Sequence, residues 1–152
     1  MGGRGKQKPA PPPPRRKETP RSHPELPGAS NSGDRLCWRF KHFDHDGPWG
    51  FNGTPGDDVA GLFRRLAKLE DMKTGEAFCG SGYPGKEYDI EAIPTALARE
   101  RLDAIGLADM TTISVVRLGG LERVYGFRCG NVFHVVWWDP EHEIWPPQKK
   151  HT

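Results

Sequence analysis

Large apolar residues begin to recur at every second position from Leu36 onward. Leu36, Trp38 and Phe40 are each separated from the next by one residue of different character. This two-residue period predicts a first strand with one buried face. The Gly- and Asp-rich segment 44–56 then interrupts the pattern and predicts irregular structure.

A helical period follows this segment. Asp57 and Asp58 favour a helix start, because carboxylates accept the free backbone N–H groups of the first turn. The apolar residues after them recur at intervals of three and four, which predicts an amphipathic helix over 57–72. Thr74 favours a further short turn. The apolar positions of the helix are Val59, Leu62, Phe63, Leu66 and Leu69.

The middle of the chain is expected to contain a loop and then a second helix. Residues 79–93 are rich in Gly and polar side chains and predict the loop. Pro94 in the first turn and Gly106 just after the end favour a helix over 94–105. Its apolar face is expected at Leu97, Ala98, Leu102 and Ile105.

Three strand-like segments complete the pattern, at 113–118, 121–127 and 132–138. The connections at 119–120 and 130–131, Gly-Gly and Gly-Asn, are turn signals, so the three segments predict an antiparallel meander. The last segment is apolar on both faces and is therefore expected to be a central strand covered on both sides.

The order of these elements predicts an α+β fold. An N-terminal strand and two to three helices precede the three-stranded antiparallel meander, which packs against the helices. We expect the helices on one face of the sheet and a partly open second face, where a site can lie. The predicted domain covers 35–147.

Charge separates the two ends from this domain. Residues 1–35 carry eight Lys or Arg against three Asp or Glu, whereas residues 36–152 carry 14 against 17. Residues 1–34 hold eight prolines and five glycines and predict a disordered basic tail. Two interpretations of this tail remain open: a tether for an acidic partner or nucleic acid, and a solubilising segment. Residues 148–152 form a short basic C-terminal tail.

Several classes of protein lose support from the sequence. No apolar run reaches the ~18–20 residues that span a bilayer, and the N-terminus has no apolar stretch of a signal peptide. The three cysteines form no CxxC pair, which favours reduced thiols in the cytoplasm. Neither GxGxxG after a strand nor GxxxxGK[ST] is present, so no cofactor is expected.

The stretch GGLERVYGFRCGNVFHVVWWDPEHEIW, residues 119–145, carries a resemblance to a known family. Its turn, its strand with Arg-Val-Tyr, its short hairpin and its apolar strand followed by a His resemble RelE/ParE-type toxins, and the upstream elements over 36–145 fit the same order. Members of that family that are ribonucleases cleave messenger RNA at the ribosome, others act on gyrase, and a small antitoxin protein neutralises them. The resemblance therefore implies a toxin that cleaves mRNA without a metal, with RNA, the ribosome and an antitoxin as partners.

The resemblance also implies roles for individual residues. Arg123 matches the arginine that contacts the scissile phosphate, a task that suits the fixed fork of a guanidinium. His142 lies near the position of a proton-transferring Arg or His, where an imidazole would protonate the leaving 5′-oxygen or take the proton of the 2′-hydroxyl. The remaining candidates bind the substrate: Trp145 stacks on a base, and Lys149, Lys150 and Arg128 contact its phosphates.

Other interpretations of the same residues remain open. Arg123 can simply pair with Glu122, Glu141 or Glu143, and the residues around His142 can form an ordinary turn. The domain can also be a non-enzymatic protein-interaction module with Trp49 and Trp145 as exposed anchors.

A metal-dependent nuclease is the third, weaker hypothesis. His42, Asp44 and Asp46 alternate at the end of the first strand and offer N and O ligands. His42, Asp44 and His142 would form the metal site if the fold brought them together.

Overall fold

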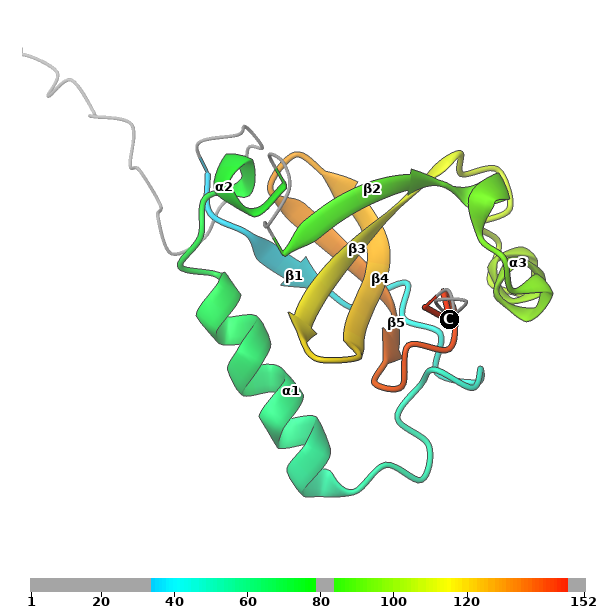
Figure 1. Ribbon diagram of the computed structural model, residues 1–152, viewed down its shortest axis with the longest axis horizontal. Helices are drawn as coiled ribbons and strands as arrows, with labels where there is room; N and C mark the ends of the chain where they lie inside the picture. The colour runs from blue at the N-terminus through cyan, green and yellow to red at the C-terminus, as the bar shows by residue number, and fades with distance from the viewer. Residues whose placement is uncertain (1–33, 79–83, 148–152) are drawn as a thin grey trace, which may run out of the picture.

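The computed structural model describes residues 34–78 and 84–147 (Figure 1). The expected disordered tail and basic C-terminal tail lie outside these residues, apart from the last residue of the former. The described part is an α+β domain with a five-stranded mixed sheet in the order β1-β5-β4-β3-β2. Its α-helices are α1 (Gly56–Leu69), α2 (Thr74–Phe78) and α3 (Ala96–Ala104). None of the helices within this part of the chain has the length and apolar character to cross a membrane.

The expected meander is matched in part, because it is the middle of a larger sheet. β3 (Thr112–Gly119), β4 (Glu122–Cys129) and β5 (Val132–Asp139) are joined in antiparallel pairs. The short N-terminal strand β1 (Cys37–Arg39) lies parallel to β5 and makes β5 an interior strand.

The opposite edge of the sheet corrects a prediction. Residues 85–89 were expected within a loop, but they form β2 (Gly85–Asp89), which pairs antiparallel with β3. Most of β2 is exposed or half-buried, so it lacks the apolar alternation of a covered strand. The backbone hydrogen bonds to β3 therefore stabilise β2, because its polar side chains bury little apolar surface.

Helices cover both faces of the sheet, which corrects the expectation that they share one face (Figure 1). Leu62 and Leu66 of α1 pack with Val124 and Trp138 on one face. Ala98 and Leu102 of α3 pack with Trp137 on the other face. Because β5 is apolar on both sides, each side needs its own cover. Leu97, expected on the apolar face of α3, is 44% exposed instead.

The loop between β1 and α1 is anchored by a buried ion pair. Asp44 is 1% exposed, and its carboxylate accepts hydrogen bonds from Arg101 Nε (2.9 Å) and Nη2 (2.5 Å) of α3. It also accepts one from the indole Nε1 of Trp137 in β5 (3.2 Å). Burial alone would raise the pKa of this carboxyl, but the hydrogen bonds from Arg101 and Trp137 hold it below its usual value. One carboxylate thus joins the loop, α3 and the central strand.

We expect Arg101→Met to lower the free energy of unfolding by about 3–5 kcal/mol, because it leaves the Asp44 charge buried without its partner. The matched control is Arg65→Met. Arg65 also forms a two-bond ion pair, with Glu122 at 2.6 and 2.7 Å, but its side chain is 41% exposed. Removing that pair is expected to cost less than about 1 kcal/mol. Denaturant unfolding of both variants measures the contrast, and equal losses would contradict it.

The same carboxylate makes stability depend on pH. Because folding depresses the pKa of Asp44, its stabilising effect is present above the unfolded pKa of about 3.9 and is lost as pH falls through the folded value. The stability difference between the wild type and Asp44→Asn should therefore shrink between pH 6 and about pH 3. Urea midpoints at both pH values measure it, and a difference that stayed constant or grew on acidification would refute the assignment.

Candidate functional site

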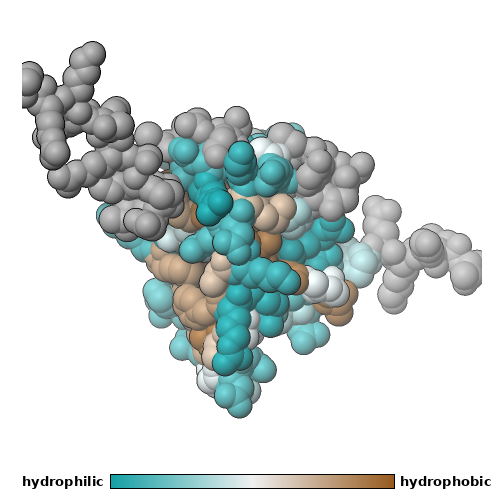
Figure 2. Space-filling view, turned by 90° about the vertical axis from the view of Figure 1, so that its left-hand side faces the viewer, coloured by the Kyte–Doolittle hydropathy of each residue, from teal (hydrophilic) through white to brown (hydrophobic). Residues whose placement is uncertain are grey.

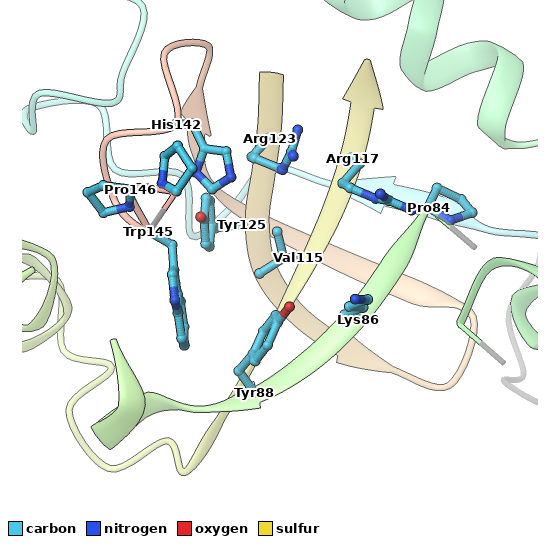
Figure 3. Close-up of a pocket in the computed structure, with 11 residues that line it drawn as sticks. Pro84, Lys86, Tyr88, Val115, Arg117, Arg123, Tyr125, His142, Trp145 and Pro146 are labelled. Atoms are coloured by element: carbon cyan, nitrogen blue, oxygen red, sulfur yellow. The ribbon is translucent and has the colours of Figure 1, made fainter. Parts of the chain in front are cut away.

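A cavity of about 370 Å³ lies on the α3 side of the sheet, where β2, β3 and β4 face the segment that follows β5 (Figure 3). Alternate residues of the three strands point into it, and the last described residues of the chain form its other wall. The cavity is lined by Pro84, Lys86, Tyr88, Val115, Arg117, Arg123, Tyr125, His142, Trp145, Pro146 and Pro147.

Three cationic side chains from three adjacent strands line this cavity. Lys86 comes from β2, Arg117 from β3 and Arg123 from β4. Arg117 and Arg123 are direct partners in the β3–β4 ladder, so their side chains emerge side by side. Among the described residues lining the cavity, none is Asp or Glu. The cavity is therefore electropositive.

Arg123 is oriented by backbone carbonyls. Its Nη1 donates to the carbonyl oxygens of Gly120 (2.7 Å) and Glu122 (3.0 Å). Within the described part of the chain it forms no ion pair, and Glu122, one of its expected partners, pairs with Arg65 instead. Burial lowers the pKa of Arg123, and the nearby Arg117 lowers it further. An anion in the cavity would oppose both effects, because a nearby opposite charge favours the protonated guanidinium.

His142 sits in a turn that is held under strain. Its φ of 57° is the one positive value outside glycine among the described residues, and it lies in the left-handed region that L-residues avoid. Its Nδ1 is buried and has no hydrogen-bond partner in the described part of the protein. Both features cost stability, and such strain is concentrated at functional sites.

Asp139 maintains this turn. Its carboxylate, fully buried, accepts hydrogen bonds from the backbone N–H groups of Glu143 and Ile144, each at 2.9 Å. Burial raises the pKa of Asp139, while the two N–H groups oppose the change. Trp49 Nε1 donates to the Glu143 carboxylate (3.3 Å) from the loop beneath. Asp139 before His142 and the N–H groups of Glu143 and Ile144 after it therefore hold the turn that positions His142.

Aromatic rings form the remaining wall. The rings of Tyr88 and Trp145 lie 4.6 Å apart between centroids at an angle of 38°. Tyr125, which is 1% exposed, lies at the base of the cavity. Burial raises the pKa of Tyr125 far above its usual value, so its hydroxyl stays protonated and neutral.

The structure brings together three of the residues that the sequence selected. Arg123, His142 and Trp145 line one cavity. Arg128 does not: it lies on the opposite face of β4, pairs with Glu87 (2.7 Å) and has its guanidinium 4.8 Å from the centre of the Phe78 ring. Arg128 therefore lies outside the cavity that Arg123, His142 and Trp145 share. Lys149 and Lys150 lie outside the described residues.

The hypothetical metal site is not formed. Asp44 is committed to Arg101 and Trp137. The ring of His42 lies 5.9 Å from that of His134, whereas His142 faces the cavity. Across residues 34–78 and 84–147, no group of three or more His, Cys, Asp or Glu side chains is placed to hold a metal ion.

Three further residues of the cavity were not predicted as site residues: Lys86, Tyr88 and Arg117. The first two lie on β2, which was expected to be loop, so no face was assigned to them. The spacing of two residues between Lys86 and Tyr88 was the sequence signal that they would share one face of a strand. Arg117 shares the alternation of Ile113 and Val115, and the predicted turn between its strand and that of Arg123 was enough to place the two arginines together.

The cavity combines the contacts that a nucleotide needs. Guanidinium and ammonium groups bind phosphate oxygens, and aromatic rings stack on bases. Comparison of the chain with protein-family models, with curated proteins and with solved structures gave no match. The resemblance to RelE/ParE-type toxins thus remains a prediction, and the chemistry has to be inferred from the cavity itself.

The strain at His142 has a measurable consequence. We expect His142→Gly to be more stable than His142→Ala by about 1 kcal/mol, because glycine adopts a φ of 57° without the steric penalty that alanine carries. Both variants remove the imidazole, so the comparison isolates the backbone. Thermal and urea unfolding of the pair measure the difference. An alanine variant as stable as the glycine variant would show that the turn relaxes and stores no strain.

Proposed function

We propose that this protein is a metal-independent endoribonuclease. The observation that supports the proposal is the cavity in which Lys86, Arg117 and Arg123 stand beside His142 and Trp145 with no carboxylate in the described lining. A cationic site of this kind favours a phosphate group over neutral or cationic ligands. The aromatic rings then favour a phosphate that carries a base.

In the proposed reaction, the arginine pair binds the scissile phosphate. The 2′-oxygen of the preceding ribose attacks phosphorus as it loses its proton, and the bond from phosphorus to the 5′-oxygen breaks. The products are a 2′,3′-cyclic phosphate and a 5′-hydroxyl. Negative charge grows on the non-bridging oxygens during the attack, where the two guanidinium groups would stabilise it.

His142 is the proposed proton-transfer group. An imidazole can take the proton from the 2′-hydroxyl or supply one to the 5′-oxygen, and such a group contributes about 10²–10⁴-fold to a rate. The strained turn, the hydrogen bonds of Asp139 and the Trp49–Glu143 contact position the backbone that carries His142 at the cavity the arginines also line. Fixed placement is what proton transfer in a transition state requires.

The proposed substrate partners follow from the same wall of the cavity. Trp145, packed on Tyr88, offers a ring face to a base. A ribosome-bound messenger RNA as target and an antitoxin protein as inhibitor are partners that the resemblance to RelE/ParE-type toxins implies, and they form part of this proposal.

The alternative, a non-enzymatic interaction module, receives less support. Trp49, one of its expected exposed anchors, is 4% exposed and packs on Trp137, and Trp145 is half-buried on Tyr88. Figure 2 shows apolar areas between polar side chains on one face of the molecule. Phe63 of α1 is 47% exposed, but nothing identifies a partner for it.

Cleavage by purified protein tests the proposal. With a metal chelator present, single-stranded RNA should be cut to leave 2′,3′-cyclic phosphate ends. Arg123→Gln and His142→Ala should each slow cleavage by about 100-fold or more. The same RNA with 2′-deoxyribose at the cut position should resist cleavage, because the attacking oxygen is absent.

Arg128→Gln is the matched control, since it removes a guanidinium from the other face of the same strand. It should cleave at the wild-type rate. Full activity of folded Arg123→Gln, or loss of all activity on chelation, would overturn the proposed mechanism. Growth arrest of a bacterial host on expression, relieved by His142→Ala at equal protein level, would be the cellular counterpart.

A further inference from the structure

The arginine pair also lines a second cavity. This second space, of about 320 Å³, lies over the turn between β3 and β4. It shares Pro84, Arg117 and Arg123 with the first cavity. The two guanidinium groups therefore stand at the boundary between two adjoining spaces. The second cavity is lined by Pro84, Arg117, Leu118, Gly119, Gly120 and Arg123.

The two spaces differ in character. The first has the Tyr88–Trp145 ring pair and His142, whereas neither the rings nor the histidine line the second. The floor of the second is the Gly119–Gly120 turn, and a Cβ atom added at either glycine would meet no atom within 4 Å. The second space is therefore open and without side chains that would recognise a particular base.

The arginine pair itself indicates what lies at the boundary. Arg117 and Arg123 hold directly opposed positions of the β3–β4 ladder, so their side chains emerge next to each other. As in the first cavity, the described lining of the second contains no carboxylate. Two guanidinium groups at one boundary can contact the oxygens of one phosphate together. A phosphate with groups attached on both sides would reach into both spaces at once.

We propose that the two cavities form one track for a single-stranded polynucleotide, with a phosphate between Arg117 and Arg123. One nucleotide lies in the first cavity with its base on the Tyr88–Trp145 pair, and its neighbour lies over the Gly119–Gly120 turn. The identification of the ligand as nucleic acid rests on the proposed function, but the track does not require cleavage.

The geometry excludes a paired substrate. A base reaches an aromatic side chain by its face only when it has left a helical stack, so the nucleotide in the first cavity has to be unpaired. Because His142 lines only the first cavity, proton transfer would take place on that side of the bound phosphate. The second nucleotide then adds affinity with little base preference.

Binding of 2′-O-methyl RNA, which has no free 2′-hydroxyl and cannot be cleaved by this route, tests the track. We expect a single-stranded trinucleotide to bind at least about tenfold more tightly than a nucleoside monophosphate, because phosphate contacts supply most of the affinity for single strands. A duplex of the same sequence should bind more weakly than the single strand. Fluorescence titration at two or more salt concentrations measures all three.

Gly120→Asp and Gly120→Asn form the matched pair of variants. Gly120 has a φ of 49°, a conformation that Asp and Asn tolerate better than other L-residues, and the two side chains have the same shape. Asp places a negative charge in the second cavity. It should weaken trinucleotide binding about tenfold relative to Asn, and binding of the monophosphate in the first cavity should respond less.

Arg117→Gln provides a second measurement that does not alter the turn. It should reduce the slope of log affinity against log salt by about 0.7, the value for one phosphate contact on a single strand. A trinucleotide that binds no better than a monophosphate, or equal effects of Gly120→Asp and Gly120→Asn, would overturn the track. Length-dependent binding without cleavage of ordinary RNA would instead overturn the proposed reaction and leave the track in place. Absence of binding by any single strand to the folded protein would overturn both.

Discussion

The Asp44–Arg101 ion pair is the contact on which the rest of the molecule depends. A carboxylate that is 1% exposed has to be neutralised, and its hydrogen bonds come from α3 and from Trp137 of the central strand. Held in this way, the loop places Trp49 against β5, where its carbonyl accepts the Trp138 N–H and its indole reaches Glu143. The turn that carries His142 is therefore supported by an interaction far from the cavity.

Periodicity predicted the parts of the fold that bury a regular face. α1, β3 and β4 follow from the spacing of their apolar residues, and β5 follows from its continuous apolar run. β2 could not be recognised in this way, since its stability comes from pairing with β3 rather than from burial. The apolar character of β5 on both faces already required two covering layers, and α3 supplies the second one.

The predicted part of the site comes from β4 and the segment directly after β5. Arg123, His142 and Trp145 all lie within the segment 119–145. Arg128 lies outside the cavity, because its distance of five residues from Arg123 puts it on the opposite face of the strand. Asp44 was misjudged as a metal ligand for another reason. Its partner Arg101 is 57 residues away, and no local pattern indicates such a contact.

The pairing of β1 with β5 has a consequence for how the protein is made. Asn131, at the start of β5, donates its side-chain N–H to the carbonyl of Arg35, 96 residues earlier, and β1 aligns in parallel with β5. Contacts of such high contact order close slowly and late. During translation, the first strand has to wait for the last one to leave the ribosomal exit tunnel. A nascent chain therefore cannot complete the five-stranded sheet, or close the cavity with His142 and Trp145, until β5 and the residues after it have been synthesised.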